Sequence, residues 1–200
     1  ILAGGAGKEC LPLSSIRPKT LFQIHGKYIL DYVIDGVIDA GITSLVVVKG
    51  HLGDKIDSIV EKHRKKGIHV DLIDQGSIQG IENVLLACRN YFKEEDPFLL
   101  AYGDIIVKPE FYHHLLDTYY TTSSDAAMAV ILWEQVEQFG VASINSYGRI
   151  KRLTPFSKGL ELPDYVHAGA SILPGYFFDL LEEEKSIEKT INRMIAENRH

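Results

Sequence analysis

The sequence contains few cysteines and no long apolar run. Its two cysteines, Cys10 and Cys88, match no metal-binding spacing, which argues against a thiolate metal site and a disulfide scaffold. Such sparse use is typical of proteins kept in a reducing compartment, so we predict a cytoplasmic location. The runs without charged residues are far shorter than the roughly 20 apolar residues of a membrane-spanning helix. The sequence therefore predicts a protein with no membrane partner.

Basic residues are too few for a nucleic-acid-binding surface. Lysine and arginine number 21 against 27 aspartates and glutamates, which gives a formal net charge of -6, so we predict no nucleic-acid partner. The one basic cluster, Lys62 to Lys66, falls at the end of a predicted helix, where we expect it to complement the helix dipole and face solvent. No signal peptide is recognisable. Because the chain starts at Ile1, within its first predicted strand, we expect a few residues upstream of it.

The hydrophobic pattern predicts an α/β fold. Apolar residues make up 46% of the chain and charged residues 24%, as in ordinary globular domains. In the first part of the chain, predicted strands at 2–3, 44–48, 68–73 and 97–102 alternate with predicted helices at 28–40, 53–66, 79–92 and 108–121. This alternation indicates a doubly wound, mostly parallel mixed sheet flanked by helices, which is a Rossmann-like arrangement.

After about residue 125 the pattern changes. Short strands are predicted at 126–132, 141–144, 150–153 and 170–173, and two helices follow at 175–184 and 186–199. No linker and no internal repeat separates the two parts. We therefore predict a single domain, residues 1–200, with a nucleotide-binding half at 1–124 and a mixed, sugar-binding half at 125–200.

A glycine-rich loop directly follows the first predicted strand. Gly4, Gly5 and Gly7 fall within four residues, which is more than a simple turn needs. A Walker-type P-loop is excluded, because Leu2 stands where that motif needs its first glycine and Glu9 where it needs serine or threonine. A dinucleotide-binding fingerprint is excluded because a proline-containing stretch follows where a helix should begin. Since backbone N–H groups of such a turn can converge on phosphate oxygens, we predict a phosphate-binding site.

Further motifs follow this loop in order. After the loop come Pro12-Leu13-Ser14, Pro18-Lys19-Thr20-Leu21 and Gly26-Lys27. Later come Gln75 with Gly80, Gly103-Asp104, Phe139-Gly140-Val141 and His167-Ala168-Gly169. Over nearly the whole chain, this ordered set resembles the motifs of the sugar-1-phosphate nucleotidyltransferases, also called nucleotide-diphospho-sugar pyrophosphorylases.

The resemblance implies the nucleotide-diphospho-sugar transferase fold and a Mg²⁺-dependent reaction. In that family a sugar 1-phosphate attacks the α-phosphorus of a nucleoside triphosphate, so that a nucleotide sugar forms and pyrophosphate leaves. These two substrates are the expected partners. The site must bring two anions together and stabilise charge along the line of attack.

The resemblance also implies roles for individual residues. The base is expected to lie against Leu2, Ala3, Gly4, Gln75 and Gly80, and the triphosphate along Gly5, Ala6 and Gly7. Lys19 is expected to supply a cation to the phosphate of the sugar substrate. Asp104, after Gly103, is expected to ligate Mg²⁺, the alternative being a plain helix N-cap. Gly140 and Gly169 are expected to let the backbone approach the sugar.

Three positions depart from the family's pattern. Glu9 stands where the family has an arginine that contacts the triphosphate, and Lys8 is the residue that could replace that arginine. Pro155-Phe156-Ser157 stands where Glu-Lys-Pro binds the sugar in the family. Lys158, or Glu161 with Pro163 in a shifted loop, could replace that motif. Thr190 stands where a second Mg²⁺ carboxylate is expected. These departures leave a second hypothesis open, in which the chain is a catalytically weakened homologue that binds nucleotide or nucleotide sugar as a regulatory subunit.

The sequence leaves the substrates and the assembly open. Backbone contacts and one glutamine can serve a purine or a pyrimidine, and the sugar segments are where the pattern departs most. Another phosphorylated acceptor, such as phosphocholine, stays open as well. The assembly alternatives are a homo-oligomer and a complex with a catalytic partner subunit.

Overall fold

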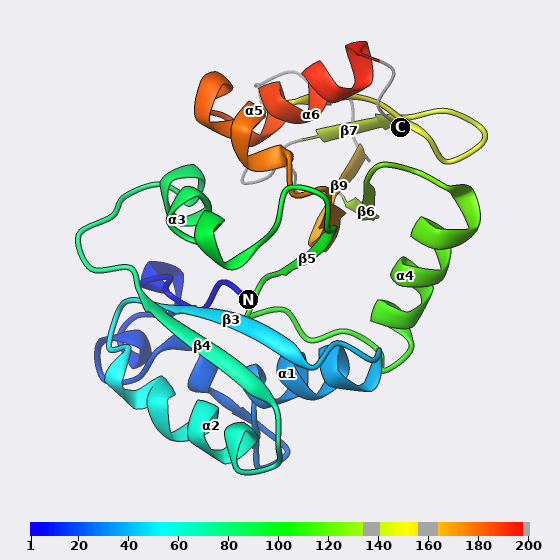
Figure 1. Ribbon diagram of the computed structural model, residues 1–200. Coiled ribbons are helices and arrows are strands. Elements are labelled where there is room, and N and C mark those ends of the chain that lie inside the picture. Colours follow the sequence, from blue (N-terminus) through cyan, green and yellow to red (C-terminus); the bar gives the residue numbers. More distant parts are fainter. Residues whose placement is uncertain (134–140, 156–163, 198–200) are drawn as a thin grey trace. The chain divides into compact units, whose positions relative to one another are not determined.

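The computed structural model describes residues 1–133, 141–155 and 164–197 (Figure 1). The chain forms two compact units, of which the first comprises Ile1–Val84 with Leu100–Leu116 and the second Leu85–Leu99 with Asp117–His200. The units interleave along the chain. The predicted division of roles between residues 1–124 and 125–200 stays a prediction.

The first unit is built on parallel strands. β3 (Ser44–Lys49) pairs in parallel with β4 (His69–Asp74), in a register that joins Ser44 to His69 and Lys49 to Asp74 (Figure 1). Leu2 forms isolated parallel bridges with Val48 and with Tyr102, so the first predicted strand is reduced to one bridging residue. This arrangement places the glycine loop directly beyond the bridge.

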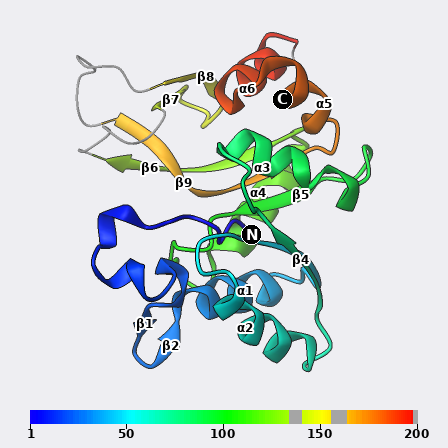
Figure 2. The ribbon, with the colours of Figure 1, turned by 90° about the vertical axis from the view of Figure 1, so that its left-hand side faces the viewer.

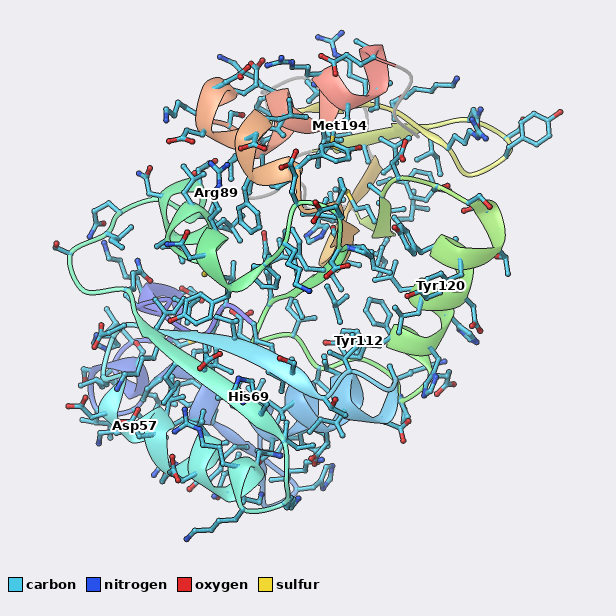
Figure 3. All side chains as sticks on the ribbon, viewed as in Figure 1. Asp57, His69, Arg89, Tyr112, Tyr120 and Met194 are labelled. Carbon is cyan, nitrogen blue, oxygen red and sulfur yellow. The ribbon has the colours of Figure 1, made fainter. Side chains whose placement is uncertain are left out.

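Two amphipathic helices of this unit lie next to each other, α1 (Ile29–Asp39) and α2 (Asp54–Arg64) (Figure 2). Apolar residues at helical spacing on α1 are buried, among them Leu30, Val33 and Ile34. Both helices match their predicted positions. Tyr112 of α4 (Phe111–Thr122) is buried and labelled in Figure 3, and its ring lies against Gly36, where an added β-carbon would stand 3.1 Å from Tyr112 Cε2.

Several short elements were not predicted, and most of them belong to the first unit. They are a hairpin of β1 (Gln23–Ile24) and β2 (Lys27–Tyr28) and three 3₁₀ turns at Lys8–Cys10, Leu13–Ser15 and Lys19–Leu21. The predicted helix 79–92 is interrupted. It consists of α3 (Ile81–Ala87) and a 3₁₀ turn at Arg89–Tyr91. Elements this short carry no hydrophobic period, so the sequence pattern does not reveal them.

The expected solvent-facing basic cluster is confirmed for Lys62, Arg64, Lys65 and Lys66, which are exposed, and is wrong for His63. His63 has 0% relative exposure and its Nε2 lies 2.9 Å from Oδ1 of the buried Asp31. Lys62 Nζ donates to the same carboxylate oxygen at 3.0 Å. The reason is that α2 turns this side toward α1, so His63 and Asp31 join the two helices in the interior.

The second unit is dominated by antiparallel pairing. β5 (Phe98–Ala101) begins in this unit, and its sheet has the order β5-β9-β7-β8, with β6 also pairing with β9. β6 (Ala127–Trp133) and β7 (Val141–Ile144) both run antiparallel to β9 (Asp164–Leu173), and β7 also pairs with β8 (Ile150–Thr154). β9 begins six residues before its predicted start at residue 170. Its first half mixes polar and small residues and contains Gly169, which weakens the strand signal.

Two helices, α5 (Phe177–Glu184) and α6 (Ile187–Ala196), complete the second unit (Figure 2). Asn192 of α6 accepts from Leu153 N at 2.8 Å and donates to Leu153 O at 2.7 Å, which fixes α6 against β8. Phe92, Phe98 and Phe178 form a cluster of three rings, with the Phe98 centroid 4.7 Å from that of Phe92 and 4.9 Å from that of Phe178, and the Phe92 and Phe178 centroids 5.6 Å apart. The predicted α/β class, a mixed sheet with flanking helices, is confirmed.

Among the helices of the described ranges, none combines the length and the apolar character that crossing a membrane would require.

Candidate active site

A cavity of about 350 Å³ lies in the first unit, at the end of the bridge formed by Leu2. Its wall consists of parts of the glycine loop, the two residues after it, two residues of the third 3₁₀ turn and one strand-end carboxylate. These residues are Leu2, Ala3, Gly5, Ala6, Gly7, Lys8, Glu9, Lys19, Thr20 and Asp104. The structure thus brings together the predicted loop, Lys8, Lys19 and Asp104.

Backbone hydrogen bonds place the loop and Asp104 beside each other. Leu2 N donates to Ala101 O at 2.9 Å, and Gly103 N donates to Leu2 O at 2.9 Å. On the other side, Ala3 N donates to Val48 O at 2.8 Å. Leu2 and Ala3 are therefore held between two chain segments, and the carboxylate of Asp104 emerges at the same edge as the loop, where parallel sheets bind ligands.

Gly7 is required by the fold of the loop. Its φ is +59°, in the left-handed region that glycine adopts without strain. An added β-carbon would stand 3.2 Å from Lys19 Cβ and 3.3 Å from Ser14 Cβ. A side chain at position 7 would therefore crowd both Lys19 and Ser14 beside the cavity.

Gln75 lies beside the loop without lining the cavity. Its backbone N donates to Lys49 O at 2.7 Å, and its Nε2 donates to Ile78 O at 2.7 Å. These bonds direct the amide oxygen against Gly4. Its predicted neighbour Gly80 has a φ of +82° and also belongs to the first unit.

Sequence reasoning missed two residues that support the loop, Gly50 and His51. His51 N donates to Gly4 O at 3.2 Å, and His51 Nε2 lies 2.7 Å from Ser14 O. Because a carbonyl only accepts, Nε2 carries the proton in this contact. A β-carbon on Gly50 would stand 2.6 Å from Gly4 O. The signal that could have revealed the pair is a glycine at the end of a buried strand.

Lys19 joins two carboxylates at the cavity. Its Nζ lies 2.5 Å from Glu9 Oε1 and 2.7 Å from Asp104 Oδ2. The side chains of Lys19 and Asp104 are each 28% exposed, and that of Glu9 is 57% exposed. The residue predicted to hold a phosphate and the residue predicted to hold Mg²⁺ are thus paired with each other, and Glu9, the first departure from the family pattern, completes the group.

The ion pairs shift the pKa values of their members. Burial by itself would lower the pKa of Lys19, but hydrogen bonds to Asp104 and Glu9 outweigh it and raise the pKa to about 12. The hydrogen bond from Lys19 lowers the pKa of the Glu9 carboxyl. Lys19 is therefore a cation, and Glu9 an anion, throughout the neutral range.

Lys8 differs from Lys19 in its surroundings. It lines the cavity and is exposed, and within the described part of the chain no ion pair engages its side chain. An exposed ammonium at the mouth of a glycine loop can attract an anion, as predicted for the replacement of the family's arginine.

The other predicted residues belong to the second unit or fall outside the described ranges. Gly169 belongs to β9 in the second unit, with a φ of +89°. Gly140 and Lys158 lie outside the described residues. Thr190 has 0% exposure and its Oγ1 donates to Ser186 O at 2.8 Å, so this hydroxyl is committed to α6.

Within residues 1–133, 141–155 and 164–197, no three His, Cys, Asp or Glu side chains gather into a metal-binding group. The donors at the cavity are the carboxylates of Asp104 and Glu9, both oxygen ligands of the kind that Mg²⁺ prefers. Their chemistry fits a hard cation that also takes oxygens from a bound phosphate.

Comparisons with known proteins identify the family of the chain. The family model described as nucleotidyl transferase matches residues 1–199. Agl11 of Haloferax volcanii, a low-salt glycan biosynthesis nucleotidyltransferase, is 27% identical over 179 residues, which cover 89% of this chain and 48% of that protein. AglF of the same organism, a UTP–glucose-1-phosphate uridylyltransferase, is 30% identical over 157 residues, covering 75% of this chain and 61% of that protein. The chain thus spans less than two thirds of the length of either relative.

The fold is similar to that of a solved UDP-glucose pyrophosphorylase complexed with UDP-glucose. The TM-score is 0.82 at 19% sequence identity, and the match covers 100% of this chain and 86% of the other. At this identity the likeness shows the fold alone.

Proposed function

The chain belongs to the nucleotidyl transferase family, and we propose that it joins a nucleoside triphosphate and a sugar 1-phosphate into a nucleotide sugar with release of pyrophosphate. The observation that carries the proposal is the cavity that the glycine loop shares with Lys19 and Asp104. Two relatives support it by name, since one is a nucleotidyltransferase and the other a uridylyltransferase acting on glucose 1-phosphate.

In this proposal the glycine loop binds the nucleotide. The backbone N–H groups of Gly5 to Gly7 face the triphosphate, and Leu2, Ala3, Gly4, Gln75 and Gly80 border the base. Gln75 presents an amide to the base side of the loop because its backbone and Nε2 are already anchored. Lys8 supplies an exposed positive charge to the triphosphate, the role expected of an arginine elsewhere in the family.

Lys19 and Asp104 serve the reacting phosphates. Lys19 offers an ammonium to the phosphate of the sugar substrate and thereby reduces the repulsion between two anions. Asp104, with Gly103 giving it a close backbone approach, would hold Mg²⁺ together with phosphate oxygens. When bound, Mg²⁺ would neutralise charge on the triphosphate and on the departing pyrophosphate. Thr190 takes no part, because its hydroxyl is buried in α6.

The remaining assignments rest on the resemblance. We propose Gly140, Gly169 and Lys158 for the sugar side, and a cytoplasmic protein, for which two free cysteines are typical. Assembly as a homo-oligomer, or with a catalytic partner subunit, is proposed on the same footing. In the relatives named above and the described part of the chain, no observation favours the regulatory alternative.

The test is pyrophosphate release. Purified protein with Mg²⁺ is incubated with each common nucleoside triphosphate and a panel of hexose 1-phosphates. Release that requires both substrates and is lost in Asp104→Asn would support the transferase and identify its substrates. Glu110→Gln, at an exposed carboxylate of the same unit, is the matched control and should keep full activity.

Silence across the panel would contradict the transferase. If the same protein were nevertheless stabilised against heat by a nucleotide or a nucleotide sugar, the regulatory subunit would replace it as the better reading.

A further inference from the structure

The proposed function assigns no role to Glu9, although Glu9 forms an ion pair with Lys19. Lys19 Nζ has three N–H donors, and Glu9 Oε1 and Asp104 Oδ2 lie 2.5 and 2.7 Å from the nitrogen. Two of the three donors therefore point at carboxylates. An ammonium held between two negative charges presents little net positive charge to an incoming phosphate.

The charges of the cavity lead to the same conclusion. Its ionised side chains are Lys8, Glu9, Lys19 and Asp104, two of each sign. Both negative charges lie at Lys19, where Glu9 and Asp104 contact its ammonium. No ion pair engages Lys8 within the described residues. A triphosphate thus meets one exposed ammonium at Lys8 and one neutralised ammonium at Lys19.

Lys19 must give up a carboxylate partner before its ammonium can bind a phosphate. A divalent cation at Asp104 would remove one of the two carboxylate partners of Lys19 and leave it with Glu9, a partly exposed partner that a phosphate can displace. Since Glu9 is 57% exposed, its side chain can turn toward solvent once Lys19 gains a phosphate partner.

We propose that Glu9 is a positioning residue that, together with Asp104, holds Lys19 away from phosphate until a divalent cation takes Asp104. The inference rests on the proposed function, which gives Lys19 to the phosphate of the sugar substrate and Asp104 to Mg²⁺. It adds that Lys19 also meets the triphosphate, because it lines the same cavity as the glycine loop. Its consequence is that nucleotide and cation bind with positive coupling, and that Glu9 makes the affinity for the nucleotide low when the cation is absent. By linkage, the nucleotide raises the affinity for the cation by the same factor.

Glu9→Gln tests the proposal, because it removes the charge and keeps the side-chain size. The dissociation constant of UTP, the nucleotide named in the uridylyltransferase relative, is measured by calorimetry with Mg²⁺ and with EDTA. In Glu9→Gln the affinity in EDTA should rise about fivefold, a size set by a partly exposed ion pair, while the affinity with Mg²⁺ changes less. The coupling between Mg²⁺ and UTP therefore shrinks. Glu110→Gln should leave both constants unchanged.

A second measurement follows Lys19 directly. Nitrogen-15 spectra of the lysine side chains give the pKa of Lys19, which is raised to about 12 by its two partners against the opposing effect of burial. Glu9→Gln should lower this pKa, and Glu110→Gln should not. A Glu9 that only stabilised the loop would leave the cation dependence of UTP binding unchanged, although the pKa of Lys19 would still fall.

Three outcomes would overturn the inference. If Glu9→Gln loses affinity with Mg²⁺ and is unchanged in EDTA, Glu9 is a ligand of the cation instead. If UTP binds the wild type with the same Mg²⁺ dependence as the variant, Glu9 does not act on Lys19, and the proposed function stands without it. If neither UTP nor any other common nucleoside triphosphate binds the wild type, the proposed function fails and this inference with it.

Discussion

The side-chain amide oxygen of Gln75 occupies the space in which a β-carbon on Gly4 would stand. Gln75 cannot easily withdraw, because its own N–H and its Nε2 donate to Lys49 O and Ile78 O, each at 2.7 Å. The peptide after β3 closes the same space, since Gly50 N would lie 3.2 Å from that β-carbon. The first glycine of the loop is therefore required by contacts that come from two later strand ends.

Gly4→Ala should destabilise the protein. The methyl group meets an anchored amide and backbone atoms, and overpacking of this kind costs about 1–3 kcal/mol of unfolding free energy. Urea denaturation followed by circular dichroism measures the loss. Gly5→Ala is the matched control, because a β-carbon there meets no heavy atom within 4 Å, and it should change the stability by less than about 0.5 kcal/mol. Equal losses in the two variants would show that Gln75 does not constrain the loop.

The Glu9–Lys19 ion pair should contribute stability that depends on pH. The hydrogen bond from Lys19 lowers the folded-state pKa of Glu9, so its contribution is present above the unfolded value of about 4.3 and is lost as the pH falls through the lowered value. Lys19, whose pKa is raised to about 12, contributes fully below its unfolded value of about 10.4 and loses this contribution toward pH 12.

Glu9→Gln measures the acid side of this dependence. At pH 7 the variant should be less stable than the wild type by at most about 1 kcal/mol, because Glu9 is 57% exposed. The difference should shrink as the pH is lowered from about 5 to about 3. Denaturant titrations across that range provide the measurement, and a difference that grew on acidification would contradict the assignment.

Asp31→Ala should cost far more stability than Asp39→Ala. Both aspartates belong to α1 and both contact a histidine, Asp31 with His63 at 2.9 Å and Asp39 with His113 at 3.1 Å. The first pair is buried. Removing Asp31 leaves an imidazole N–H of His63 without a partner in the interior, which should lower the unfolding free energy by about 3–5 kcal/mol. The second pair is exposed, at 67% and 46%, and is worth less than about 1 kcal/mol.

The two variants form a matched set, because each truncates an aspartate of the same helix. Thermal and urea unfolding give both free energies. Similar losses for the two would mean that the buried contact contributes no more than an exposed one, which would contradict the role of His63 in joining α1 to α2.

Long periodic elements could be predicted from the sequence, and short or irregular ones could not. The apolar spacing from Tyr28 to Ile38 predicts α1 because one face of an 11-residue helix must be buried. The 3₁₀ turn at Lys19–Leu21 and the hairpin of β1 and β2 are too short to show a period. The first half of β9 was missed because its burial comes from pairing with β6, which lies more than thirty residues earlier.

The candidate site divides in the same way. The glycine loop could be found from its residue types, and Lys19 and Asp104 from the resemblance of the ordered motifs to the family. The contact of Lys19 with Glu9 and Asp104 could not be found, because it depends on which loops meet in the folded chain.

The sequence by itself determined the α/β class, the order of the long elements, the glycine loop and the family to which its motifs belong. The class, the order of the elements and the loop follow from local chemistry, namely helical and strand periodicity and the conformational freedom of glycine. The family rests on the resemblance of the ordered motifs. Only the tertiary structure decided that Lys19 is shared by two carboxylates, that Gln75 shapes Gly4 and that His63 is interior. Each of these depends on distances between residues far apart in the chain, and packing sets those distances.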